Sequence, residues 1–320
     1  MRIRCAVLDD YQGVALTMAD WSSIAGTVDV TSHPRHFADP DELVAAIGDC
    51  EIVVVMRERT PFPAALFARL PRLRLLVTSG RQNASIDLAA AAAHGVTVCG
   101  TASSGLPPAE LTWALILGLA RNLVAENTAL RGGGPWQSTI GTDLHGRRLG
   151  LIGLGRIGGT VATVGRAFGM DVIAWSQHLG NQRCDELGVQ LASSKEELLE
   201  SSDFVSIHLA LGERSRGLIG APELRLMRRS AYLVNTARAA IVDRSALLTA
   251  LTEGWIAGAG LDVFETEPLP ADDPLRTLPN VLATPHLGYV TQANYRTYFP
   301  EVVADIAAFL AGSPIRTLTA

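Results

Sequence analysis

Residues 147–158 read Arg-Arg-Leu-Gly-Leu-Ile-Gly-Leu-Gly-Arg-Ile-Gly, an apolar run that leads directly into three spaced glycines. Leu149–Ile152 has the pattern of a buried strand, and Gly159–Phe168 that of a helix, with a further strand predicted at Val172–Trp175. Strand, glycine turn, helix and strand in this order predict a Rossmann unit that binds a dinucleotide.

Each glycine of this turn has a separate task. Gly153 permits the tight turn, Gly155 lets the backbone approach a pyrophosphate, and Gly158 allows the helix to pack closely on the strand. The amino end of the following helix supplies N–H groups to the phosphates. We therefore expect Gly153, Gly155 and Gly158 to bind a nicotinamide dinucleotide.

The end of the second strand of such a unit normally carries an Asp or Glu that bonds the adenosine ribose and repels a 2′-phosphate. Here the chain reads Trp175-Ser-Gln-His178, with Ser176 at that position. Ser176 can bond a ribose hydroxyl but does not exclude NADP by charge, and the nearest arginine in sequence is Arg183. The sequence favours NAD and leaves NADP open.

Short apolar runs alternate with helical stretches along the rest of the chain. This alternation predicts an α/β fold with parallel sheets covered by helices on both faces. The runs are Ile3–Leu8, Ile52–Val55, Leu75–Thr78, Val96–Val98, Phe204–Ile207, Tyr232–Val234 and Ala259–Val263, besides the two named above.

A chain of 320 residues is long enough for two domains. One long helical pattern runs from Glu110 toward Leu130 and separates two sets of predicted strands. We expect one domain over 1–101 and another over 102–288. The tail, 289–320, contains an amphipathic helix at Tyr298–Leu310, which we expect to return to the first domain.

Composition restricts the class of partner. Hydrophobic residues make up 48% of the chain, charged residues 18%, and the net charge is −5 without a dense basic run. This excludes an electrostatic site for nucleic acid or an anionic membrane. No apolar run approaches about 18 residues, and the amino terminus lacks a signal-peptide pattern. A cytoplasmic protein with a small-molecule partner is expected.

Four cysteines lack the spacing of a metal site, and we expect buried thiols and no bound metal. They are Cys5, Cys50, Cys99 and Cys184.

Three chemically active side chains each follow a predicted strand of the second domain. They are Arg238 in Asn235–Asp243, Glu267 just before Pro268, and His286 in Thr284-Pro-His-Leu-Gly288. Ligands of open α/β sheets bind beyond the carboxyl ends of the strands. Reduction of a 2-oxo acid needs a cation for the carboxylate, a proton donor and a group that keeps the donor protonated. Arg238, His286 and Glu267 match these needs, with Glu265 as the competitor of Glu267.

In this order, these motifs resemble the D-isomer-specific 2-hydroxyacid dehydrogenases, a family that includes hydroxypyruvate and glyoxylate reductases and phosphoglycerate dehydrogenases. The resemblance also covers Leu76–Gly80 and Trp136. It implies two doubly wound domains, the Rossmann domain being inserted into a flavodoxin-like substrate domain, and a homodimer formed through the cofactor domain. By the same resemblance Arg238, Glu267 and His286 are catalytic, and the cofactor is lined by Arg156, Ile157, His208, Thr236, Ala237 and Asp262.

The substrate loop departs from the family pattern. Where the family usually has Gly-x-Gly, the chain reads Ser79-Gly80-Arg81-Gln82-Asn83. Gly80 and Arg81 are expected to bind substrate together with Arg238, and Asn83 is a further candidate for the carboxylate. The fold alone also allows another class of function, a nicotinamide-sensing protein similar to a corepressor with little turnover.

Overall fold

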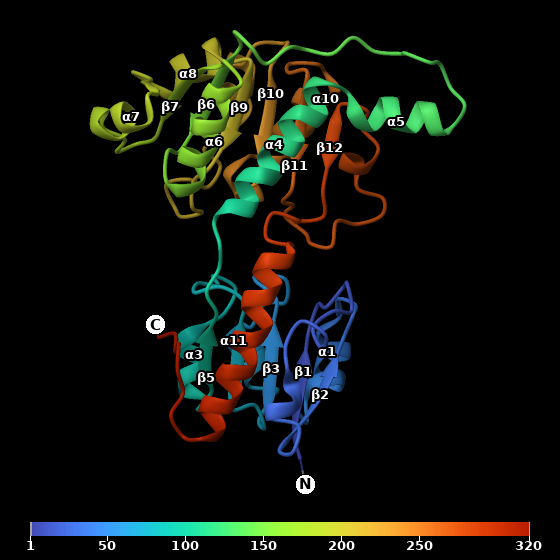
Figure 1. The fold of residues 1–320 in the computed structure, drawn as a ribbon, viewed down its shortest axis with the longest axis vertical. Helices are drawn as coiled ribbons and strands as arrows, with labels where there is room; N and C mark the ends of the chain where they lie inside the picture. The colour runs from blue at the N-terminus through green and yellow to red at the C-terminus, as the bar shows by residue number, and fades with distance from the viewer. Residues whose placement is uncertain (1, 320) are drawn as a thin grey trace. The chain divides into compact units, whose positions relative to one another are not determined.

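The computed structural model describes residues 2–319, which divide into two compact units. Unit 1 comprises the chain up to Ser104 together with the segment from Thr291 onward, and unit 2 comprises Gly105–Val290. These bounds lie a few residues from the predicted ones. Each unit can be followed by its colour in Figure 1.

Unit 1 is built on a parallel sheet. Over the residues described, its five strands have the order β2-β1-β3-β4-β5, a flavodoxin-like order. The strands are β1 (Ile3–Val7), β2 (Val28–Ser32), β3 (Ile52–Val55), β4 (Leu75–Thr78) and β5 (Thr97–Gly100). The helices are η1 (Trp21–Ser23), α1 (Pro40–Ile47), α2 (Ala64–Phe67), α3 (Leu88–Ala93) and α11 (Gln292–Leu310), of which α11 packs on β4.

Unit 2 contains a larger parallel sheet. Over the same described residues it has seven strands in the order β12-β11-β10-β9-β6-β7-β8. The strands are β6 (Arg148–Ile152), β7 (Asp171–Trp175), β8 (Gln190–Leu191), β9 (Phe204–Ile207), β10 (Tyr232–Asn235), β11 (Gly258–Leu261) and β12 (Val281–Ala283). The order reverses between β6 and β9, which is the switch point at which doubly wound sheets bind ligands.

Helices cover both faces of this second sheet (Figure 1). They are α4 (Leu106–Ala120), α6 (Arg156–Ala167), α7 (Asn181–Leu187), α8 (Lys195–Ser201), α9 (Ala221–Leu226) and α10 (Arg244–Thr252). The unit also contains the short η2 (Ala239–Ile241) and η3 (Pro274–Arg276), and α5 (Leu123–Arg131), which contacts α4 and extends away from the sheet (Figure 1). Successive residues of β6 enter opposite cores: Leu149 and Leu151 pack in one and Ile152 in the other. The predicted fold class is confirmed.

The single long helix expected from Glu110 toward Leu130 is wrong. The structure breaks it into α4 and α5 at Asn122, whose φ of 50° is left-handed. Asparagine tolerates this conformation better than most residues. The helix also begins earlier than expected, because Pro107 and Pro108 occupy its first turn, where missing N–H groups cost nothing.

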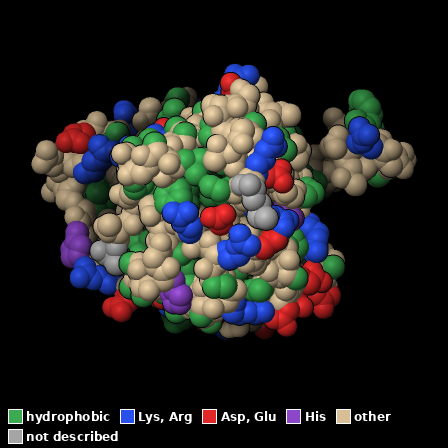
Figure 2. Space-filling view, turned by 90° about the horizontal axis from the view of Figure 1, so that it is seen from below, with side chains coloured by type: hydrophobic (Ala, Val, Ile, Leu, Met, Phe, Trp, Pro, Cys, Tyr) green, Lys and Arg blue, Asp and Glu red, His purple; other side chains and the backbone are tan. Residues whose placement is uncertain are grey.

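On the face shown in Figure 2, basic side chains are interspersed with acidic ones. Among residues 2–319, no helix combines the length and the apolarity required to cross a membrane.

Candidate active site

The first and third glycines of the turn after β6 are required by close backbone packing. Gly153 has a φ of 104°, and a Cβ there would lie 2.7 Å from the carbonyl oxygen of His208. A Cβ on Gly158 would collide with the carbonyl oxygen of Gly153. These two positions therefore admit only glycine without movement of the backbone.

Gly155 differs, because a Cβ built on it would have open space within 4 Å. It is the N-cap of α6, and no side chain caps this helix end. The first turn contains the exposed Arg156 and the half-buried Ile157. An uncapped helix amino end facing open space is suited to an anionic group. The turn therefore fits a dinucleotide pyrophosphate.

A cavity of about 920 Å³ opens beside this turn, at the end of β7. Ser176 and His178 line it from the β7 side, and Leu209, Leu211 and Arg214 from the segment after β9. Arg214 Nη1 lies 3.1 Å from His178 Nε2. The cavity has the place in the fold where the adenosine half of a dinucleotide binds.

Sequence reasoning considered only Arg183 as a cation near Ser176. In the structure Arg183 donates to the Leu154 carbonyl at 3.2 Å and pairs with Glu186 at 3.1 Å. The cation that lines the cavity is instead Arg214, which is distant in sequence. Its place shortly after a strand of the same sheet edge was the signal that could have identified it.

His208 follows β9 and forms a wall of the glycine turn. Its Nε2 lies 2.9 Å from Ser206 Oγ, and its backbone N–H donates to Ile152. Burial lowers the pKa of His208 to about 4. The imidazole is therefore neutral at physiological pH.

This pKa predicts an acid-sensitive contribution to stability. The pKa of His208 is about 4 in the folded state against 6.5 ordinarily, so folding disfavours its proton. Above pH 6.5 the imidazole is neutral in both the folded and the unfolded protein and costs no stability. As the pH falls toward 4, protonation of the unfolded state lowers the free energy of unfolding. His208→Gln should reduce the loss of unfolding free energy over this range by roughly 1–2 kcal/mol. Urea unfolding at pH 7 and pH 4.5 measures it, and equal losses in both proteins would contradict the assignment.

The turn after β10 carries Arg238 and is held by a buried amide. Asn235 Oδ1 accepts from the Ala237 N–H at 3.0 Å, and Asn235 Nδ2 donates to the Arg238 carbonyl at 3.0 Å. Thr236 Oγ1 lies 2.8 Å from Thr112 Oγ1 of α4. The half-buried Arg238 donates through Nη1 to the Ala237 carbonyl at 2.7 Å. The turn thus fixes both the backbone and the guanidinium of Arg238.

Glu267 and His286 form a direct pair. The distance from His286 Nδ1 to Glu267 Oε2 is 2.6 Å, and their side chains are 14% and 20% exposed. The other carboxylate oxygen of Glu267 accepts from the Phe264 N–H at 2.9 Å. The carboxylate is therefore oriented by backbone on one side and by the imidazole on the other, as a partner of a general acid should be.

Asp262 fixes the segment on which His286 lies. It is fully buried after β11 and accepts from Thr284 Oγ1 at 2.6 Å, from the Leu287 N–H at 2.7 Å and from the Gly288 N–H at 2.8 Å. Burial raises the pKa of Asp262, while these hydrogen bonds and His286 act in the opposite direction. His286 itself has a φ of 54°, a conformation in which histidine is enriched.

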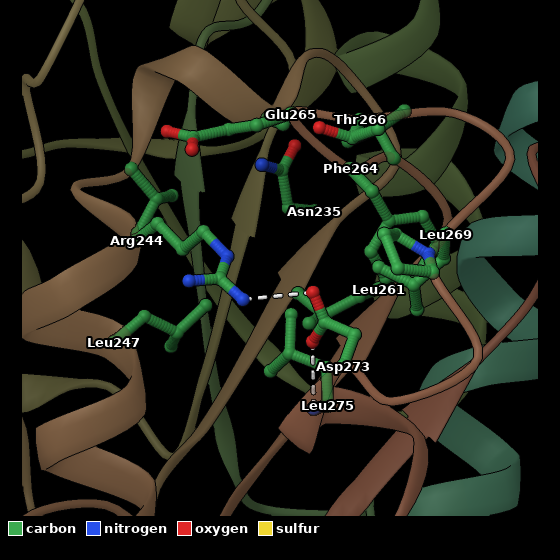
Figure 3. Close-up of a pocket in the computed structure, with 14 residues that line it drawn as sticks. Asn235, Arg244, Leu247, Leu261, Phe264, Glu265, Thr266, Leu269, Asp273 and Leu275 are labelled. Carbon is green, nitrogen blue, oxygen red and sulfur yellow. Dashed lines mark hydrogen bonds and ion pairs between the residues drawn. The ribbon is translucent and has the colours of Figure 1, made fainter. Parts of the chain in front are cut away.

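Glu265 and Glu267 have different surroundings. A second cavity, of about 300 Å³, lies beside Glu265 (Figure 3). Glu265 and Thr266 line it, whereas Glu267 pairs with His286. At its far wall Arg244 Nη2 binds Asp273 Oδ2 at 2.7 Å, and Asp273 Oδ1 accepts from the Leu275 N–H at 2.9 Å. This pair anchors the far end of the loop that carries Glu267.

The predicted substrate residues Gly80 and Arg81 lie in unit 1. Gly80 is buried with a φ of 93°, and its N–H donates to Thr101 Oγ1 at 2.9 Å, whereas Arg81 is exposed. Asn83 bonds within its own unit, to the Arg57 carbonyl, Thr78 and Ser85. Its amide therefore orders the loop.

Sequence reasoning missed Arg57. Its guanidinium occupies the space that a side chain on Gly80 would need. Applying the strand-end rule to the first domain would have found it, because Arg57 follows β3.

The comparisons with known proteins agree with this geometry. The model of the D-isomer specific 2-hydroxyacid dehydrogenase NAD binding domain matches residues 113–288. A glyoxylate reductase of Korarchaeum cryptofilum is 38% identical over 84% of this chain and 82% of its own. A D-3-phosphoglycerate dehydrogenase of Methanocaldococcus jannaschii is 36% identical over 85% of this chain and 52% of its own. The crystal structure of a phosphoglycerate oxidoreductase from Vibrio cholerae has a TM-score of 0.92 at 36% identity, covering 97% of this chain and 100% of that one.

The fold, the glycine turn and these similarities thus define the class of the protein as a nicotinamide-linked oxidoreductase. The chain belongs to the D-isomer specific 2-hydroxyacid dehydrogenase family, and its cofactor is NAD(H).

Proposed function

We propose that the protein is a D-2-hydroxyacid dehydrogenase that acts physiologically as a reductase of a small 2-oxo acid. The observation that carries this proposal is the Glu267–His286 pair at 2.6 Å. Glu267 follows β11, the neighbour of the strand that precedes Arg238, and His286 follows β12, the next strand of the sheet. All three therefore follow strands on the ligand-binding edge of the sheet. Relatives named glyoxylate reductases support a short substrate.

The bound nicotinamide supplies or accepts the hydride. Arg238 binds the substrate carboxylate and carbonyl oxygen through its planar fork of N–H donors. His286 donates a proton to the carbonyl oxygen, through Nε2, as negative charge develops there. Glu267 accepts a hydrogen bond from His286 Nδ1 and so fixes the orientation and tautomer of the imidazole. In the reverse direction His286 removes the hydroxyl proton.

The remaining site residues divide between cofactor and substrate. We assign unit 2 as the cofactor domain, with the glycine turn, Ser176 and His208 in contact with the dinucleotide. Further cofactor contacts are assigned to Arg156, Ile157, Thr236, Ala237 and Asp262. We assign unit 1 as the substrate domain, in which Gly80 and Arg81 bind the acid. Arg57 is added to them because its guanidinium adjoins Gly80.

We further propose a homodimer of the cytoplasm. Large apolar side chains on α5 and the segment after it are more than half exposed: Leu123, Val124, Leu130, Trp136 and Ile140. Such a concentration marks a protein interface. The four free, buried thiols fit a reducing compartment. A mass in solution twice that of one chain is expected, and a monomer at micromolar concentration would contradict the dimer.

The function is tested by following absorbance at 340 nm with NADH or NADPH and each of five acids: glyoxylate, hydroxypyruvate, pyruvate, phenylpyruvate and 2-oxoglutarate. Oxidation dependent on one or more acids is expected, with values of kcat in the usual range of about 1–10³ s⁻¹. Absence of turnover across the panel, with cofactor binding confirmed, would contradict the reductase and favour a nicotinamide-sensing role.

A further inference from the structure

The cavity at the end of β7 has an unusual charge for a site that selects NAD. Its ionisable lining residues are His178, Glu213 and Arg214. The position after β7, where a carboxylate would repel a 2′-phosphate, holds the half-buried hydroxyl of Ser176. Glu213, the residue before Arg214 in the loop after β9, also lines the cavity. The position of the missing strand-end carboxylate therefore holds a neutral hydroxyl. The guanidinium of Arg214, the imidazole of His178 and the carboxylate of Glu213 also line the cavity.

Arg214 and His178 meet across this cavity from different elements. Arg214 belongs to the loop after β9, and His178 to the turn after β7, with 3.1 Å between Nη1 and Nε2. Arginine has only donors, so Nε2 is the acceptor in this contact. A phosphate is a stronger acceptor for a guanidinium than a neutral imidazole, because both partners are then charged. A phosphate placed between them would bind Arg214 and accept a hydrogen bond from His178 Nε2 in the tautomer that carries its proton on Nε2.

We propose that Arg214, with Ser176 and His178, forms a binding site for the adenosine 2′-phosphate. The protein then takes NADP(H) as well as NAD(H), and binds NADP(H) more tightly. This inference rests on the proposed function only in placing a dinucleotide on the glycine turn. Arg214 is a specificity-determining residue, because it contacts the group by which the two cofactors differ.

Binding without turnover tests this directly. Calorimetric titration of the full-length protein with 2′,5′-ADP and with 5′-AMP isolates the contribution of the 2′-phosphate. We expect the 2′-phosphate to strengthen binding by about tenfold or more, the value of a charge-assisted hydrogen bond. Raising the salt concentration should reduce this advantage, since both partners are exposed. Equal affinity for the two nucleotides would overturn the proposal.

Two substitutions test which residues bind the 2′-phosphate. For each variant, cofactor fluorescence gives the ratio of the Kd for NADH to the Kd for NADPH. Arg214→Ala should lower this ratio about tenfold. Ser176→Asp, which places a carboxylate beside the ribose, should lower it further. The matched control is Arg216→Ala, because Arg216 is exposed on the same loop and does not line the cavity. An unchanged ratio in Arg214→Ala would overturn the assignment.

These outcomes are independent of the catalytic proposal. If the protein binds NADPH preferentially but reduces none of the acids, the reductase function fails and the 2′-phosphate site stands. If it reduces an acid with NADH and shows no preference for 2′,5′-ADP, the site fails and the function stands.

Discussion

Replacing His286 with asparagine is expected to lower kcat by about 10²–10⁴, the usual contribution of a positioned general acid. The pair with Glu267 at 2.6 Å orients the imidazole, and no amide can supply the proton that the reduced carbonyl oxygen requires. Cofactor affinity should change little. Steady-state kinetics with the best substrate, together with a titration of NADH, measure the two effects separately.

Asparagine is chosen because His286 has a left-handed φ of 54°. Asparagine tolerates this conformation, whereas alanine there would add a stability cost to the kinetic one. The control is His145→Asn, which changes an exposed histidine of the same unit. A His286→Asn enzyme that retains wild-type kcat would show that another group donates the proton.

Replacing Arg238 with alanine is expected to lower kcat/KM by about 10²–10³, because a charged pair with the substrate carboxylate is lost. Arg238→Lys should recover only part of the loss, since an ammonium does not provide two parallel donors. The Asn235 amide holds the backbone of this turn independently of the guanidinium, so both variants should fold. Kinetics on the best acid of the panel measure the change.

The control for Arg238 is Arg216→Lys, on an exposed arginine. Recovery of full activity in Arg238→Lys would indicate that a simple positive charge suffices. An unchanged kcat/KM in Arg238→Ala would remove Arg238 from the site.

Much of the fold follows from local pattern, because strands buried on both faces read as continuous apolar runs. β3, β4 and β9 lie at the predicted residues. The sequence analysis missed β2, β8 and β12. β2 (Val28–Ser32) alternates in burial, and β8 is only two residues long. All three lie at sheet edges, where one-sided pairing imposes a weaker apolar pattern.

The site residues likewise include some that the local sequence predicted and some that it did not. Glycine spacing and strand ends pointed to the residues of the turn after β6 and to the Glu267–His286 pair, whose contacts the structure supplies. Arg214 and Arg57 were missed because their relevance comes from tertiary proximity: Arg214 meets His178 from a separate loop, and Arg57 meets Gly80 across neighbouring strands. No local spacing records either contact.

The most direct measurement is the transfer of deuterium from cofactor labelled at both C4 hydrogens of the reduced nicotinamide to the best 2-oxo acid larger than glyoxylate, with the product analysed by mass spectrometry and chiral chromatography. We expect a D-2-hydroxy acid that carries one deuterium at C2. A product without deuterium at C2, or of the L configuration, would contradict it.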